Sequence, residues 1–454
     1  MHKSIKLAIC LLLLILFPAT AFAGEVLDTY EPTTLSKTGA YYMAELHTDT
    51  ILFSKNADKQ MYPASLTKIM TAIVALEHCP DLNQIVTYSQ EAYDWVEAQY
   101  EAAGGNVSSA GLHLGEQMTV KDLLYGCLIS SGNDAAEILA FHVGGTNTAF
   151  YDMMNAKAKE LGAVNTNFCN ANGLFDENHY TTAYDMYLIT KYAMQNETFA
   201  EIVATKAYQS APTNMNPNGY KWKTTIFLMD PTSNYFYSND IKGVKTGTLL
   251  AAGRCLVTVM EKDIDHGEHA KYMLVLMGAD IYGDRVDFQE TKAFYNWALG
   301  DYTVHEFYEQ EEYVQDIDIR FAKTKQETLA LVSAESAYGF FEQNGSAFTV
   351  HDIRYEFTVD PEVVNKKGSI NAPVEKGQVI GTLKIMNGTK ELDSVQLLAS
   401  ETVERNWIKW LFFTVVESLI FKILLGLVVL VLVIRTINKI RYRNRYGGSS
   451  RLRF

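Results

Sequence analysis

The chain has 454 residues, of which 48% are hydrophobic, so it can bury more than one core and is not a disordered protein. Its formal net charge is −14, and setting aside the nine basic residues of its two ends leaves −23 for residues 7–434. Such an acidic body argues against nucleic acid or an anionic surface as its partner.

The first 23 residues have the pattern of a secretory signal. Lys3 and Lys6 form a basic start, residues 7–17 are apolar, and an Ala-Phe-Ala site precedes Gly24. Export signals have this order of charge, apolar run and small-residue cleavage site. We therefore predict a signal peptide over residues 1–23 and a mature chain that begins near Gly24.

The first folded elements follow from the spacing of apolar residues. Residues 39–54 have strand-type side chains on both sides of a polar break, which predicts a β-hairpin. Residues 65–78 repeat apolar side chains at helical spacing after Pro63, which predicts a buried helix. Two more helices are predicted over residues 120–129 and 134–143, interrupted by a Ser-Ser-Gly-Asn turn.

Later segments complete one α+β unit. Residues 254–260 and 272–277 are short apolar segments of strand type, and residues 286–299 form a closing helix. A hairpin at the start and strands with a helix at the end indicate that the terminal elements share one sheet. We assign this unit to residues 24–300.

The character of the chain changes over residues 301–400. Residues 313–319, 328–332 and 379–386 alternate or cluster as strands, and Asn387 with the glycine after it is a hairpin signal. We predict a smaller all-β domain here.

A second apolar segment, residues 411–434, is long enough for a transmembrane helix. Its 24 residues would reach about 36 Å as a helix, and only Glu417 and Lys422 interrupt it. Residues 435–454 carry seven basic residues and no acidic one, an excess typical of the cytoplasmic side. We predict a single-pass anchor in the cell membrane, with the body extracytoplasmic and the tail cytoplasmic. An amphipathic helix lying in the membrane interface is the alternative.

The cysteines and histidines suggest neither a disulfide scaffold nor a metal site. Four cysteines outside the signal are too few and too scattered for a disulfide framework, and they are either buried thiols or members of one or two bridges. They are Cys79, Cys127, Cys169 and Cys255. No Cys or His spacing matches a structural zinc site or an H-E-x-x-H motif, so no metal or other cofactor is expected.

Ser65 and Lys68 stand three residues apart at the start of a predicted helix, so both side chains project from one face. A serine hydroxyl is a poor nucleophile. A lysine in a dry pocket beside another cation loses its proton more easily and can then activate the hydroxyl. Alone this pattern is weak, because serine at a helix start is commonly a cap.

Two further motifs follow in order. One reads Ser-Gly-Asn from Ser131, 66 residues after Ser65, and the other reads Lys-Thr-Gly from Lys245, a further 114 residues on. The order S-x-x-K, S-x-N and K-T-G is the signature of penicillin-binding proteins and serine β-lactamases. Over roughly residues 30–400 the chain resembles the D-alanyl-D-alanine carboxypeptidases among the low-molecular-mass penicillin-binding proteins.

The resemblance implies a fold and an activity. The fold is an α+β catalytic domain with a central antiparallel sheet and helices, followed by the small all-β domain and the transmembrane helix. The activity is that of a serine carboxypeptidase that removes the terminal D-alanine from peptidoglycan pentapeptides ending in D-Ala-D-Ala. β-Lactams would be its covalent inhibitors.

The resemblance also implies the site residues. Ser65 attacks the carbonyl between the two D-alanines, Lys68 takes its proton, and Ser131 passes a proton toward the leaving amine. Backbone N–H groups of Ser65 and Thr248 stabilise the oxyanion, and Arg285 binds the terminal carboxylate. The implied substrate-binding residues are Asn133, Lys245, Thr246, Gly247, Thr248 and Arg285.

Simpler interpretations and other functions stay open. Ser131 and Asn133 are common in turns, Thr246 suits any strand, and Arg285 could form a surface ion pair, while His179 is expected to be structural. A transpeptidase would use the same nucleophile. A β-lactamase is disfavoured because no E-x-x-L-N segment lies between the second and third motifs. A membrane-tethered peptidoglycan-binding protein without turnover would not need both lysines.

Overall fold

The structure is a computed structural model that describes residues 35–36, 39–105, 107–264, 268–342, 353–365 and 368–446. The predicted signal peptide, residues 1–23, lies outside the described residues, as do Arg451 and Arg453 of the basic tail.

The first of two compact units, residues 1–305 and 340–348, is built around an antiparallel sheet. Its central strands in spatial order are β7 (Ile241–Leu249), β8 (Gly253–Ile264), β9 (Glu268–Ala279), β1 (Ala40–Glu45) and β2 (Ile51–Lys55). The remaining two strands of the sheet are β10 (Tyr302–Tyr308) and β13 (Ala337–Glu342). The predicted hairpin is confirmed, and so is the pairing of early and late elements in one sheet.

The predicted helices of this unit are all present, as α2 (Thr67–His78), α4 (Val120–Leu128), α5 (Asn133–Gly144) and α9 (Val286–Asp301). Four further helices are absent from the sequence prediction: α3 (Gln90–Ala102), α6 (Asn147–Glu160), α7 (Ala183–Ala193) and α8 (Glu197–Ala204). Each of these four follows a residue whose side chain caps the first turn, namely Ser89, Thr146, Thr182 and Asn196. Such caps are the sequence signal that could have located them.

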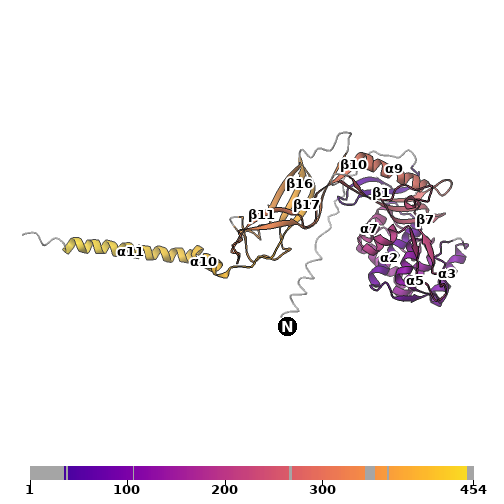
Figure 1. Ribbon diagram of the computed structural model, residues 1–454, viewed down its shortest axis with the longest axis horizontal. Helices are drawn as coiled ribbons and strands as arrows, with labels where there is room; N and C mark the ends of the chain where they lie inside the picture. The colour runs from indigo at the N-terminus through magenta and orange to yellow at the C-terminus, as the bar shows by residue number, and fades with distance from the viewer. Residues whose placement is uncertain are drawn as a thin grey trace, which may run out of the picture. The chain divides into compact units, whose positions relative to one another are not determined.

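Helices cover both faces of the sheet. Figure 1 shows α9 over one face and α2, α5 and α7 over the other. Because side chains alternate across a strand, β9 contributes Met273 and Val275 to the core around α2 and α5, and Leu274 and Leu276 to the core around α9. The sheet is therefore buried on both faces, and β7 borders it with β8 as its strand neighbour.

The first unit also contains two small two-stranded sheets and a 3₁₀ turn. These antiparallel sheets pair β3 (Ile85–Thr87) with β4 (Gln117–Thr119) and β5 (Ala207–Gln209) with β6 (Lys221–Lys223). The 3₁₀ turn η2 (Phe227–Met229) follows β6.

The second unit, residues 306–339 and 349–454, contains a six-stranded sheet. Its spatial order is β14 (Ile353–Val359), β16 (Val379–Asn387), β17 (Lys390–Ala399), β12 (Thr328–Ser333), β11 (Tyr313–Arg320) and β15 (Ile370–Asn371). The predicted turn is confirmed, because β16 and β17 form a hairpin with Asn387 opposite Lys390. Gly388 in this turn has φ +61°, a conformation that glycine adopts at little cost.

The C-terminal apolar segment differs from the single helix predicted over residues 411–434. It forms α10 (Trp407–Glu417) and α11 (Leu419–Tyr446), divided at Ser418. The reason is a cap: the Ser418 hydroxyl accepts the backbone N–H of Phe421 at 3.1 Å and starts a new helix. Within α11, residues Ile420–Arg443 are long and apolar enough to cross a membrane.

Candidate active site

The predicted nucleophile lies on a tight turn ahead of α2. Ser65 is the middle residue of the 3₁₀ turn η1 (Ala64–Leu66), which runs directly into the helix. Ala64 has φ +49°, a left-handed conformation that is unfavourable for a residue with a side chain and is frequent at active sites. Thr67 braces the turn, because its hydroxyl donates to Ala64 O at 2.8 Å. Lys68 follows one turn later, with Nζ 3.0 Å from Ser65 Oγ.

The Lys68 amine is fully buried and has two further partners. Nζ lies 2.7 Å from Asn133 Oδ1 and 2.6 Å from the carbonyl oxygen of Asn172. Burial lowers the pKa of Lys68 to about 8, although interactions with Cys127 and Glu137 partly oppose this shift. An amine with this pKa is about one-tenth neutral at pH 7, so it can accept a proton.

A second buried lysine links the second and third motifs. Lys245 on β7 donates from Nζ to Ser131 Oγ and to Thr246 O, each at 2.9 Å. Burial, together with the charge of Lys68, holds the pKa of Lys245 well below its usual range. Ser131 lies between α4 and α5 with φ +61°, so a strained turn orients its hydroxyl. The three motifs, far apart in the sequence, therefore meet at two lysines.

Strand β7 passes close beside the Ser65 turn at Gly247. A Cβ atom on Gly247 would lie 3.0 Å from Pro63 O and 3.1 Å from Ser65 N. A side chain there would push the strand and the turn apart, so glycine permits their close approach. Thr246 is fixed beside it by a hydrogen bond between its hydroxyl and that of Thr225 at 2.7 Å.

Comparison with known proteins agrees with these motifs. The family described as D-alanyl-D-alanine carboxypeptidase matches residues 29–280, more than half of the chain. The chain belongs to this family. A second family, described as penicillin-binding protein 5, C-terminal domain, matches residues 302–405. The protein is thus a serine D-Ala-D-Ala carboxypeptidase of the low-molecular-mass penicillin-binding proteins, and the predicted α+β fold with a following β domain is confirmed.

Similar proteins match the carboxypeptidase over most of their length. D-alanyl-D-alanine carboxypeptidase DacF of Bacillus subtilis (strain 168) is 29% identical over 400 residues, which cover 85% of this chain and 94% of DacF. DacC of Escherichia coli (strain K12) is 29% identical over 409 residues, 86% of this chain and 90% of DacC. The crystal structure of penicillin binding protein 5 from Haemophilus influenzae has the same fold, with a TM-score of 0.62 at 24% identity, covering 83% of this chain and all of that one.

The carboxypeptidase holds Arg285 in an ion pair. Its Nε and Nη2 atoms bind the two carboxylate oxygens of Asp287 at 2.9 and 2.5 Å. Among the described residues, no hydrogen bond joins this guanidinium to Ser65 or Lys68. The loop before Arg285 is nevertheless tied to β8, because Arg254, which pairs with Thr248 across the strands, donates to the carbonyl oxygen of residue 284 at 2.7 Å.

Sequence reasoning missed Asn172, because its contact with Lys68 is made by a backbone carbonyl that any residue type could supply. The loop that carries it packs tightly on the nucleophile turn. Gly173 has φ +86°, and a Cβ atom there would lie 1.8 Å from Ala64 O. The Asn-Gly pair at residues 172–173 is therefore a turn signal that could have located the loop in contact with Lys68.

His179 is structural, as expected. Its Nδ1 accepts the backbone N–H of Cys169 at 3.0 Å, so Nε2 carries the proton and donates to Thr67 Oγ1 at 2.8 Å. Burial lowers the pKa of His179 to about 4, which keeps the ring neutral at pH 7. The imidazole thus supports the turn of Ser65 through Thr67.

The cysteines do not supply a competing nucleophile. Cys79, Cys127, Cys169 and Cys255 are all unpaired thiols. Burial raises the pKa of Cys127, the thiol beside Lys68, to about 12, so it stays protonated at pH 7.

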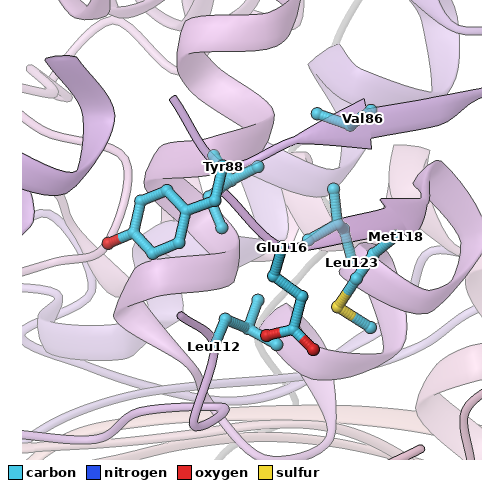
Figure 2. A pocket seen from close by; sticks show the side chains of 7 residues that line it. Val86, Tyr88, Leu112, Glu116, Met118 and Leu123 are labelled. Carbon is cyan, nitrogen blue, oxygen red and sulfur yellow. The ribbon is translucent and has the colours of Figure 1, made fainter. Parts of the chain in front are cut away.

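A small recess elsewhere in the first unit does not serve as a substrate site. Figure 2 shows it between apolar side chains of β3, β4 and α4, with the Glu116 carboxylate at one side. The recess has no room for a water molecule. Its lining residues are Val86, Tyr88, Leu112, Glu116, Met118, Leu123 and Ile138, none of which contributes to the Ser65 cluster. It is a packing gap in the core.

Proposed function

We propose that this carboxypeptidase removes the terminal D-alanine from peptidoglycan stem peptides ending in D-Ala-D-Ala, through an acyl-enzyme on Ser65. Ser65 Oγ attacks the carbonyl between the two D-alanines as its proton moves to Lys68 Nζ. The C–N bond then breaks, and the terminal D-alanine leaves once its amine has received a proton through Ser131. Water attacks the resulting ester and releases Ser65.

One observation carries the proposal: three oxygen atoms surround Lys68 Nζ. A neutral amine has two N–H donors and one lone pair. With the donors taken by Asn133 Oδ1 at 2.7 Å and Asn172 O at 2.6 Å, the lone pair points to Ser65 Oγ at 3.0 Å. A general base needs this arrangement, and the pKa of about 8 for Lys68 supplies the neutral form.

We place the substrate along β7. The backbone N–H groups of Ser65 and Thr248 would stabilise the oxyanion, and the missing side chain at Gly247 lets the peptide lie close. Asn133 would hold the substrate amide, and Lys245 would supply positive charge beside Ser131. The hydrogen bond that the Lys245 amine donates to Ser131 Oγ supports this pairing.

Thr246 and Arg285 complete the proposed site. Thr246 contributes from the same strand, with its hydroxyl oriented by a neighbouring threonine. Arg285 would bind the terminal carboxylate of the substrate. Its Nε and Nη2 atoms are engaged by Asp287, which leaves Nη1 for a ligand and fixes the plane of the guanidinium.

We also propose that α11 anchors the enzyme in the cell membrane with the catalytic domain, residues 24–300, on the outer side. The apolar span Ile420–Arg443 and the basic residues at its C-terminal end support this orientation. Residues 301–400 would then be a spacer that places the catalytic domain within reach of the wall, and residues 435–454 a cytoplasmic tail.

The test uses the full chain in detergent with a peptide ending in D-Ala-D-Ala, in the presence of EDTA. D-Alanine release should persist with EDTA, disappear in Ser65→Ala, and be unchanged in Ser54→Ala, a control at an exposed serine of β2. Release by Ser65→Ala would refute the acyl-enzyme mechanism.

A second measurement distinguishes a carboxypeptidase from a transpeptidase and from a β-lactamase. A fluorescent penicillin should label the wild type covalently and leave Ser65→Ala unlabelled. If D-alanine is released only when an amine acceptor is added, the enzyme is a transpeptidase instead. Rapid turnover of the penicillin would indicate a β-lactamase.

A further inference from the structure

A fully buried carboxylate lies one helical turn from the residues that hold Lys68. Glu137 is on α5, four residues after Asn133, and its side chain is 0% exposed. Its Oε1 accepts from Asn172 Nδ2 at 2.9 Å and from Ala171 N at 3.3 Å, and its Oε2 accepts from the hydroxyl of Tyr151 at 3.0 Å. Burying a carboxyl is costly, and none of the proposed chemical steps uses this one.

Asn172 connects Glu137 to the general base. The side-chain amide of Asn172 donates to Glu137, while its backbone carbonyl accepts from Lys68 Nζ at 2.6 Å. The same amide also bonds Gln99 of α3. Glu137 therefore anchors the loop that supplies one of the acceptors that orient the lysine. If the loop moved, the Lys68 amine would lose one of the two contacts that direct its lone pair to Ser65.

Glu137 also acts on Lys68 through its charge. The groups that face Lys68 are Cys127 of α4, Glu137 and Asp134 of α5, and Lys245 of β7. The two carboxyl groups raise the pKa of Lys68, against the larger effect of burial. Ionised Glu137 thus keeps the lysine protonated to a higher pH than burial alone would.

The groups that face Glu137 set when it is ionised. Burial raises the pKa of Glu137 to about 7, while the hydroxyl of Tyr151 on α6, the N–H of Ala171, the charge of Lys68 on α2 and Gln99 of α3 lower it. The carboxyl and the Lys68 amine therefore change charge over neighbouring pH ranges, and each affects the other.

We propose that Glu137 is a positioning residue for acylation of Ser65, acting on Lys68 through Asn172 and through its buried charge. This inference rests on the proposed role of Lys68 as general base. It adds a residue outside the three motifs that determines both where the amine points and at which pH it becomes competent.

The decisive variant is Glu137→Gln in the full chain. Glutamine keeps an acceptor for Asn172 and Ala171, and its NH₂ group can donate to the Tyr151 hydroxyl, so the contacts persist while the charge is lost. We expect the acid limb of the acylation rate, measured with a penicillin between pH 5 and 10, to move to lower pH by on the order of one unit. Lys68 would lose its proton more easily without the neighbouring negative charge.

Glu116→Gln is the matched control. Glu116 is also a buried carboxylate, 1% exposed, and accepts from the Tyr220 hydroxyl at 2.8 Å and from His113 N at 3.0 Å. It is not among the groups that face Lys68. Glu116→Gln should change the melting temperature without moving the acid limb.

Truncation tests the contact through Asn172. Glu137→Ala and Asn172→Ala should each slow acylation on the high-pH plateau roughly tenfold, because each releases the loop from its anchor. The double variant should be no slower than either single one, since both remove the same contact. Additive losses would overturn the pathway through Asn172.

These measurements test the positioning role of Glu137 separately from the proposed acylation of Ser65. An acid limb that stays in place in Glu137→Gln, or that moves equally in Glu116→Gln, would overturn the positioning role while acylation of the wild type upholds the general function. A wild type that no penicillin acylates at any pH would overturn the proposed function itself.

Discussion

Replacing Gly247 with alanine tests how close β7 must come to the Ser65 turn. The added Cβ would lie 3.0 Å from Pro63 O and 3.1 Å from both Ala64 Cβ and Ser65 N. Ordinary contact begins near 3.4 Å, so the neighbours must yield by a few tenths of an ångström. Two of these neighbours are backbone atoms, which cannot rotate away. The strand and the turn must therefore separate.

The separation should affect the rate more than the stability. A misplacement of about 1 Å at a reacting centre costs roughly a hundredfold in rate, so a few tenths of an ångström should slow acylation about fivefold. Overpacking of this size destabilises a core by about 1–3 kcal/mol. The proposed oxyanion donors, the backbone N–H groups of Ser65 and Thr248, lie on the two parts that separate. The acylation rate with penicillin and kcat/KM for the peptide should therefore fall together.

The assay compares acylation rates and melting temperatures of three proteins. The control is Gly300→Ala, at a position in α9 where a Cβ meets no atom within 4 Å and where alanine favours the helix. Gly300→Ala should acylate like the wild type. Wild-type acylation and stability in Gly247→Ala would show that the close approach of β7 is not required, and would refute the reasoning.

Three further predictions concern pH, stability and attachment. Acylation should rise about tenfold per unit below pH 8 and level off above it, because only the neutral Lys68 amine, with its pKa of about 8, accepts a proton; a flat profile from pH 6 to 9 would contradict this. Folding lowers the pKa of His179 from 6.5 to about 4, so its contribution to the free energy of unfolding is present above pH 6.5 and is lost as pH falls toward 4. Thermal melting over this range should show a loss of stability of up to about 3 kcal/mol that is absent in His179→Gln. A chain ending at Asn406, which lacks α10 and α11, should leave the membrane pellet in an alkaline wash that retains the full chain; co-sedimentation of both would argue against the anchor.

Local sequence patterns determined most of the secondary structure and the three motifs of this carboxypeptidase. The hairpin of β1 and β2, the helices α2, α4, α5 and α9 and the strands β11, β12 and β16 of the second unit are visible as apolar patterns, because each buries one face of a regular element. The motifs of Ser65, Ser131 and Lys245 are recognisable because a nucleophile, its proton partners and a glycine-bearing strand require particular residue types. Helices α3, α6, α7 and α8 were less visible, since their start is marked by single capping side chains.

Only the tertiary structure decided which groups surround Lys68, the proposed general base. The Asn172 carbonyl has no residue-type signal, and Glu137 reads in the sequence as one more helical glutamate until its burial beside that loop is known. The ion pair of Arg285 with Asp287 and the division of the C-terminal helix at Ser418 likewise depend on individual hydrogen bonds. Motifs specify residue types along the chain, whereas pKa values and lone-pair directions depend on burial and on contacts between segments 35 to 104 residues apart.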